Sequence, residues 1–276
     1  MNSNKNVELF AKLERTNPGG SVKDRIAKYM IEKAEKGGEL TKDKIILEAT
    51  SGNTGIGLAM VAASKGYKIT LVMSEGASIE RRKIMEIYGA EIILTPKERG
   101  TDGAIDKVKE LSRNKNYWNP NQFSNDHNVL AHYETTGEEI WRQTQGKITH
   151  FIAGMGTGGT LMGTGKKLKE YNLDIKMIGV EPHKERPIPG LKNMEISYIP
   201  KIFDETRLDQ KIVVRVEDAI KTAKRLAKEE GLFVGISSGA SMFGALRIIK
   251  NLEKGFIVVF FPDDGMKYLS TDLAGD

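Results

Sequence analysis

Short runs rich in β-branched residues alternate with helical patterns along this chain, and this alternation restricts the possible folds more than any other feature. Strand-like runs lie at residues 45–47, 69–72, 92–94, 151–153, 177–180 and 256–261. Helical patterns lie at residues 22–36, 54–65, 78–88, 101–113, 130–143, 160–170, 216–230 and 240–251. Such alternation predicts an α/β fold with mostly parallel sheets flanked by helices.

The length, the charge and the irregular stretches of the chain indicate how many lobes it forms and which kind of ligand it binds. The 276 residues suffice for two lobes, and the net charge of +5 arises from alternating basic and acidic residues. We therefore expect small anionic ligands and no nucleic acid. An asparagine-rich stretch at residues 117–128 predicts a boundary between lobes, and a proline-rich stretch at residues 181–209 predicts a long ordered loop near a site.

Residue types and patterns that the sequence lacks argue against disulfides, metal sites and membrane spans. The chain has no cysteine, which excludes disulfides and thiolate metal sites and favours a reducing, cytoplasmic location. No apolar run reaches the length of a membrane span. The four histidines lack the paired spacing of a metal site, so we expect no metal.

Lys23 lies in Asn-Pro-Gly-Gly-Ser-Val-Lys-Asp-Arg, residues 17–25, where a glycine-bearing turn leads into an expected helix. A helix start has unpaired N–H donors and the positive end of the helix dipole, which disfavour a lysine without a specific role. A Schiff-base lysine would have such a role. The alternative is a solvated lysine, because Lys28, Lys33 and Lys36 lie on the same helix.

A second glycine-bearing loop, residues 154–160, reads Gly-Met-Gly-Thr-Gly-Gly-Thr and connects a strand to a helix. Its glycines allow close backbone approach, and its N–H groups with the helix dipole suit a phosphate. The same loop satisfies G-x-G-x-x-G, and Glu181 lies at the end of the next strand, as a ribose-binding acid would. A nicotinamide-dependent dehydrogenase therefore remains an alternative.

Two more loops place small and hydroxyl residues at expected helix starts. Thr-Ser-Gly-Asn-Thr-Gly, residues 50–55, offers hydroxyls, an amide and N–H donors that suit a carboxylate. Gly-Ile-Ser-Ser-Gly-Ala-Ser, residues 235–241, places serine hydroxyls beside small residues. An ordinary helix cap is the alternative interpretation for both loops.

Taken together and in their order along the chain, the four motifs resemble those of the cysteine synthase family, whose enzymes depend on pyridoxal phosphate and have the tryptophan synthase β fold (fold type II). The resemblance covers nearly the whole chain. Segments at residues 78–82, 148–151 and 267–271 resemble the cysteine synthase B branch. The family normally begins with a further strand and an Ile-Gly-Asn-Thr-Pro-Leu segment, which residues 1–7 do not supply.

The resemblance implies a role for each matching residue. Lys23 would form the aldimine with pyridoxal 5'-phosphate, and Asn53 would contact the 3'-oxygen of its ring. Ser237 would face the pyridine nitrogen. The cofactor phosphate would lie on Gly156, Thr157, Gly158, Gly159 and Thr160. The substrate carboxylate would contact Thr50, Ser51, Thr54 and Gln122.

The resemblance also implies an activity and partners. The enzyme would form L-cysteine from O-acetylserine or O-phosphoserine and sulfide by β-replacement through an α-aminoacrylate, and Lys23 would act as the base. A serine opposite the ring nitrogen weakens the ring as an electron sink and favours loss of the β-substituent. Relatives are homodimers, and a serine acetyltransferase is a further expected partner. Residues 42–127 would form a smaller, mobile substrate-binding lobe, and residues 1–41 with 128–276 the larger cofactor lobe.

Several alternatives stay open from the sequence. Arg81, Arg82, Lys192 and Arg207 offer charge to a phosphate leaving group, although we favour O-acetylserine because acetate requires no such clamp. Cystathionine β-synthase and β-eliminases share the cofactor chemistry. Outside this class, the dehydrogenase and an inactive binding protein remain.

Overall fold

The computed structural model describes residues 1–275, which form two compact units: residues 1–16 with 128–275, and residues 17–127. The expected smaller lobe began at residue 42, whereas the structure groups residues 17–41 with this unit. The reason is packing: helix α1 (Lys23–Gly37) lies against helix α2 (Asn53–Lys65). The apolar face of α1, which includes Ile26, Met30 and Ile31, is buried.

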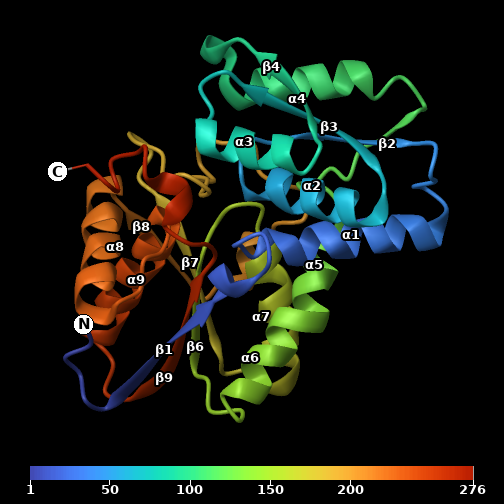
Figure 1. Ribbon diagram of the computed structural model, residues 1–276. Helices are drawn as coiled ribbons and strands as arrows, with labels where there is room; N and C mark the ends of the chain where they lie inside the picture. Colours follow the sequence, from blue (N-terminus) through green and yellow to red (C-terminus); the bar gives the residue numbers. More distant parts are fainter. Residues whose placement is uncertain (276) are drawn as a thin grey trace. The chain divides into compact units, whose positions relative to one another are not determined.

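The smaller unit contains a four-stranded sheet in the order β4-β3-β2-β5, in which every pair is parallel. Helix α4 packs over β2, β3 and β4, while α2 packs on β3 and is flanked by α3 and α1 (Figure 1). The core under α4 contains Leu47, Val72 and Val108. Its remaining elements are β2 (Ile45–Ala49), β3 (Lys68–Ser74), α3 (Ile79–Ile87), β4 (Glu91–Thr95), α4 (Gly100–Leu111) and β5 (Tyr117–Trp118).

The larger unit contains a five-stranded sheet in the order β1-β9-β6-β7-β8, again parallel throughout. Helices α8 and α9 lie on one face, and α6 and α7 lie on the other (Figure 1). Its strands are β1 (Val7–Leu13), β6 (His150–Gly154), β7 (Lys176–Pro182), β8 (Gln210–Val214) and β9 (Gly255–Phe261). Its α-helices are α6 (Glu138–Gln143), α7 (Gly159–Tyr171), α8 (Val216–Glu230) and α9 (Ile236–Ile249), and α5 (Asp126–Ala131) crosses the boundary between the units.

These sheets confirm the predicted α/β fold with parallel strands, and the differences are local. β1 was not expected because Val7 is its only β-branched residue. The helix expected at residues 130–143 is interrupted by a π-helical segment, His132–Gly137. Helix α9 begins at Ile236 and not at residue 240, because Gly235 adopts an extended conformation that serves as its N-cap.

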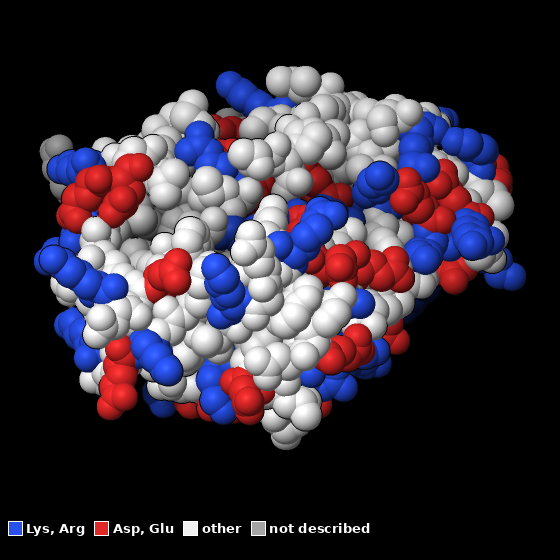
Figure 2. All heavy atoms as spheres, turned by 90° about the horizontal axis from the view of Figure 1, so that it is seen from below, with Lys and Arg blue, Asp and Glu red and all other residues white. Residues whose placement is uncertain are grey.

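Surface charge and helix hydropathy agree with the composition. Figure 2 shows basic and acidic side chains interspersed over the face in view. Oppositely charged neighbours screen one another, so this face presents no large field of one sign. Within residues 1–275, no helix combines the length and apolar character needed to cross a bilayer.

Candidate active site

Lys23 is the first residue of α1 and is half-buried. Two short-range contacts hold the turn before it: the Lys23 N–H donates to Ser21 Oγ (3.2 Å), and the Gly19 N–H donates to Asp24 Oδ2 (2.5 Å). A Cβ at Gly19 would lie 2.5 Å from Asp24 Oδ1, so the turn has no room for a side chain there. The glycine turn of the sequence motif therefore places Lys23 at a defined helix start.

The start of α2 lies beside that of α1. A Cβ on Gly57, one turn after Asn53, would lie 3.0 Å from the carbonyl oxygen of Lys23. A Cβ on Gly55 would lie 3.0 Å from Thr50 Cγ2 and 2.8 Å from Met85. Glycine at these positions lets the residue 50–54 loop fold onto α2, and at Gly57 it lets α2 approach the first turn of α1.

The predicted carboxylate site is held by hydrogen bonds in the same unit. Thr54 Oγ1 donates to Gln122 Oε1 (2.7 Å), and both side chains are buried. The Gly52 N–H donates to Thr50 Oγ1 at 3.3 Å. The structure therefore brings together Thr54 and Gln122, which are far apart in the sequence, at the N-terminal end of α2.

Sequence analysis missed Glu48, a buried acid on β2 immediately before this loop. Its Oε2 accepts the N–H of Asn121 at 2.9 Å. Burial raises the pKa of Glu48 to about 8, although hydrogen bonds from the N–H groups of Asn121 and Gln122 act in the opposite direction. An acid inside the apolar run Ile-Ile-Leu-Glu-Ala was the signal that could have identified it.

In the larger unit, the predicted phosphate loop follows β6 and leads into α7. Gly158 has a φ of 87° and forms the N-cap of α7. A Cβ on Gly156 would lie 2.8 Å from the carbonyl oxygen of Gly190, so the loop packs directly against neighbouring backbone. The first N–H groups of an α-helix have no acceptor within the helix, an arrangement that suits an anion, as the sequence predicts for this turn.

Two residues that sequence analysis did not select support this loop. Asn128 Nδ2 and the Gly159 N–H both donate to Thr157 Oγ1, at 3.2 and 3.3 Å. His132 is fully buried in the π-helical segment, and its Nε2 lies 3.2 Å from Thr160 Oγ1. A π-helical turn is frequent at functional sites, but it has no simple sequence signature.

Ser237 lies in the first turn of α9 and is buried. The N–H of Gly235 donates to the carbonyl of Asp263, in the segment that follows β9. Because β9 and β6 are neighbouring parallel strands, Ser237 and the phosphate loop lie at the same carboxyl edge of the sheet. Within residues 1–275, the buried hydroxyl of its neighbour Ser238 has no hydrogen-bond partner.

Glu181, the ribose-binding candidate of the dehydrogenase alternative, already has other contacts. It is buried on β7, accepts the N–H of Met194 (3.0 Å) and forms an ion pair with Lys211 (3.5 Å). Its carboxylate therefore stabilises the loop after β7. In that loop, the N–H of Lys192 donates to the carbonyl of Met155, which attaches it to the phosphate loop.

Two of the other basic candidates have acidic partners. Arg82 pairs with Glu86 and Arg207 with Asp204, both at 3.3 Å and both exposed. Exposed pairs of this kind contribute little energy. Among residues 1–275, no group of three or more His, Asp or Glu residues is arranged to hold a metal ion.

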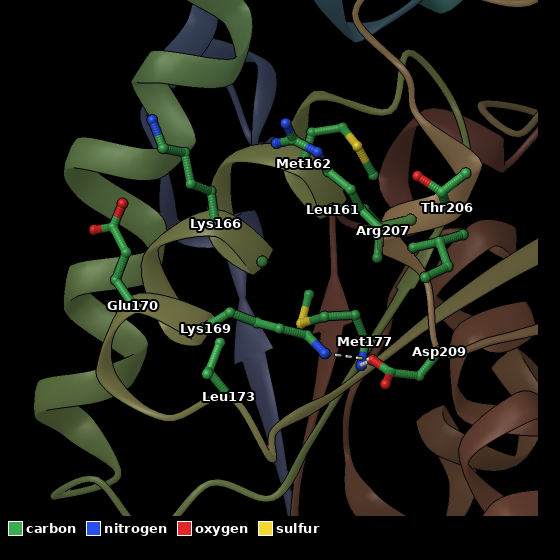
Figure 3. A pocket seen from close by; sticks show the side chains of 12 residues that line it. Leu161, Met162, Lys166, Lys169, Glu170, Leu173, Met177, Thr206, Arg207 and Asp209 are labelled. Atoms are coloured by element: carbon green, nitrogen blue, oxygen red, sulfur yellow. Dashed lines mark hydrogen bonds and ion pairs between the residues drawn. The ribbon is translucent and has the colours of Figure 1, made fainter.

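A separate pocket of about 680 Å³ lies between α7 and the segment before β8 (Figure 3). Met162 and Met177 form apolar parts of its wall, and Lys169 extends from α7 to Asp209, where the two charges lie 2.9 Å apart. Arg207, a candidate contact for a phosphate leaving group, lines this pocket, whereas none of the residues predicted to hold the cofactor or the substrate carboxylate does.

Comparison with known proteins identifies the family to which this fold and these glycine loops belong. A model of the pyridoxal-phosphate dependent enzymes matches residues 1–263. A cysteine synthase of Aquifex aeolicus is 50% identical over 277 aligned residues, which cover 98% of this chain and 85% of the relative. Cysteine synthase B of Escherichia coli is 44% identical, covering 98% and 89%. The chain therefore belongs to the cysteine synthase family of pyridoxal-phosphate dependent enzymes.

Solved structures agree with this assignment. A cysteine synthase from Entamoeba histolytica superimposes with a TM-score of 0.93 at 37% identity, covering 98% of this chain and 82% of that one. A hydrogen sulfide-producing enzyme from Fusobacterium nucleatum has a TM-score of 0.91 at 44% identity, covering 96% and 92%. The tryptophan synthase β-like fold predicted from the sequence is thus confirmed.

Proposed function

We propose that this chain forms L-cysteine from O-acetylserine and sulfide by pyridoxal-phosphate dependent β-replacement. The observation that carries the proposal is the pairing of two helix starts in the smaller unit. There, Lys23 begins α1 and Asn53 begins α2, and the two helices come close where a Cβ on Gly57 would lie 3.0 Å from the Lys23 carbonyl oxygen. The amine of Lys23 and the side-chain amide of Asn53 could then contact the same small molecule.

The phosphate loop fits the phosphate of the cofactor. Its first-turn N–H groups suit a dianion, and the hydroxyls of Thr157 and Thr160 surround the same turn. The side chains of Asn128 and His132 fix those hydroxyls from behind. We assign the phosphate to Gly156, Thr157, Gly158, Gly159 and Thr160, the 3'-oxygen to Asn53, and the pyridine nitrogen to Ser237.

Bound pyridoxal phosphate supplies an electron-accepting ring that stabilises negative charge at the substrate Cα. The Lys23 amine would take the proton from the substrate Cα. Ser237 would offer a hydroxyl to the ring nitrogen, which would leave the ring a weaker electron sink than a carboxylate would. This difference favours departure of the β-substituent over other reactions at Cα.

The substrate carboxylate is assigned to Thr50, Ser51, Thr54 and Gln122. The hydroxyls of the loop and the N–H groups at the start of α2 can donate to it. Closure of these residues on the carboxylate would exclude water while sulfide is awaited. We further propose that the enzyme is a cytoplasmic homodimer and that a serine acetyltransferase docks on it.

The absorption spectrum of the purified, cofactor-loaded protein tests this function. We expect a visible cofactor band that shifts when O-acetylserine is added and returns when sulfide follows, with cysteine as the product. A band that ignores O-acetylserine but responds to O-phosphoserine would reassign the leaving group and give a role to Lys192 in the loop beside Met155. A band that responds to neither would refute β-replacement.

Release of sulfide from cysteine is a second candidate activity. The similarity to a hydrogen sulfide-producing enzyme from Fusobacterium nucleatum favours it, and it uses the same loss of a β-substituent. The ratio of sulfide release from cysteine to cysteine formation, measured on one preparation, decides between the two. A ratio above one would make elimination the main activity.

Replacement of Gly156 by alanine is expected to weaken cofactor binding by about 10-fold or more. The added Cβ would lie 2.8 Å from the Gly190 carbonyl, so the phosphate loop would have to move. Equilibrium dialysis of pyridoxal phosphate measures the change. Gly37→Ala is a matched control, because a Cβ there has no neighbour closer than 3.8 Å. Equal affinity in both variants would contradict the assigned phosphate site.

A further inference from the structure

Glu48 is a buried acid for which the proposed reaction has no direct use. It is the fourth residue of β2 (Ile45–Ala49), and only 3% of its surface is exposed. Burying a carboxyl group is costly, and proteins retain such groups where hydrogen bonds compensate. The contacts of Glu48 therefore indicate what it does.

The carboxyl group of Glu48 holds the backbone just beyond β5. Pairing between β2 and β5 extends only from Ile45↔Tyr117 to Ile46↔Trp118. Past that point, the N–H groups of Asn121 and Gln122 both donate to Glu48. The carboxyl oxygens thus replace the partners that a longer strand would have supplied.

The held segment has an unusual backbone. Asn121 has a φ of 48°, in the left-handed region that non-glycine residues rarely occupy. Its N–H is shared between Glu48 and the side chain of Asn119, and its carbonyl accepts the N–H of Ser124. Such a conformation persists when surrounding contacts determine it, and Glu48 supplies two of them.

This segment positions the side chain of Gln122. Because Gln122 Oε1 accepts the Thr54 hydroxyl at 2.7 Å, the acceptor end of the amide is turned to Thr54. The other end of the amide, the NH2 group, is the end that can donate to a carboxylate. A continuous path of short contacts therefore leads from Glu48 through the Gln122 backbone to Thr54 at the start of α2.

We propose that Glu48 is a positioning residue for the substrate carboxylate, which it serves by fixing the Asn121–Gln122 backbone so that Gln122 presents its amide beside Thr54. The inference rests on the proposed function, because it takes Gln122 as a carboxylate contact. Glu48 itself does not touch the substrate. A glutamine at this position is nearly isosteric, but it offers one accepting oxygen to two N–H groups.

A double-mutant cycle on the cofactor-loaded enzyme tests the proposal. Glu48→Gln should raise the KM for O-acetylserine about 10-fold, the loss of one buried hydrogen bond, while the KM for sulfide and kcat change little. In a Gln122→Ala background, Glu48→Gln should change the KM by less than about 2-fold, because the group it positions is gone. Glu91→Gln, on β4 of the same sheet, is the matched control and should leave the KM unchanged.

Amide hydrogen exchange gives a second measurement that requires no activity. The peptide containing residues 119–123 should exchange about 10-fold faster in Glu48→Gln than in the wild type or in Glu91→Gln. Unchanged exchange, or an equal KM increase with and without Gln122, would overturn the inference. A wild type without β-replacement activity but with faster exchange in Glu48→Gln would refute the proposed function while the positioning of this backbone stood.

Discussion

Lys23→Ala is expected to lower the rate of cysteine formation by about 1000-fold or more. The substitution removes the amine that would hold the cofactor covalently and then take the proton from the substrate Cα. It leaves the phosphate loop at the start of α7 intact, because that loop is held by Asn128 and by the Gly190 backbone. The variant should therefore still bind pyridoxal phosphate noncovalently.

The measurement has two parts and one matched control. Turnover with O-acetylserine and sulfide gives the rate, and dialysis gives the amount of cofactor retained. Lys28→Ala is the control, because Lys28 is an exposed lysine one turn further along the same helix. Wild-type turnover in Lys23→Ala would remove Lys23 from the chemistry. Equal losses in both variants would point to the stability of α1 and not to the amine.

Much of the fold could be predicted because parallel sheets leave a strong pattern in the sequence. Buried parallel strands are nearly continuous apolar runs, and the runs expected at residues 69–72 and 177–180 lie within β3 and β7. β1 was missed because it is an edge strand. Glu8 and Lys12 interrupt its apolar residues, so it does not form a continuous apolar run. A search for continuous apolar runs therefore does not find a strand that is only half-buried.

The site residues that could be predicted are those marked by neighbouring residues in the sequence, and the ones that were missed depend on distant contacts. Lys23, Asn53 and the phosphate loop were selected because glycine turns and helix starts lie within a few residues of one another. Asn128 and His132 were not, because their importance comes from contacts with Thr157 and Thr160, about 30 residues away. The assigned roles of all these residues remain predictions.

The boundary between lobes shows the limit of composition as a guide. An asparagine-rich segment predicts a change near residue 128, and the larger unit resumes at Asn128. The boundary at residue 17 was not predicted, although a glycine-bearing turn begins there, because α1 joins the smaller unit only through packing against α2. Side-chain packing, which a sequence does not display, determines that grouping.

Glu48 gives the protein a stability that depends on pH in a defined direction. Burial raises the pKa of this carboxyl from 4.5 to about 8, so the folded protein keeps the proton over a range in which the unfolded chain has released it. The free energy of unfolding must then fall as pH rises from 4.5 through 8. At about 1.36 kcal/mol per pKa unit, this contribution is about 4 to 5 kcal/mol.

Glu48→Gln is therefore expected to gain stability relative to the wild type as pH rises, by about 4 to 5 kcal/mol between pH 4.5 and pH 8. Urea unfolding of the wild type and the variants, from below pH 4.5 to above pH 8, measures the difference. Glu35→Gln is the control of opposite sign, because hydrogen bonding from Lys65 lowers the pKa of Glu35. Its stabilising contribution is present above pH 4.5 and is lost at lower pH, so Glu35→Gln should lose stability relative to the wild type as pH rises. Parallel curves for the wild type and Glu48→Gln would show that Glu48 titrates alike in the folded and unfolded chains.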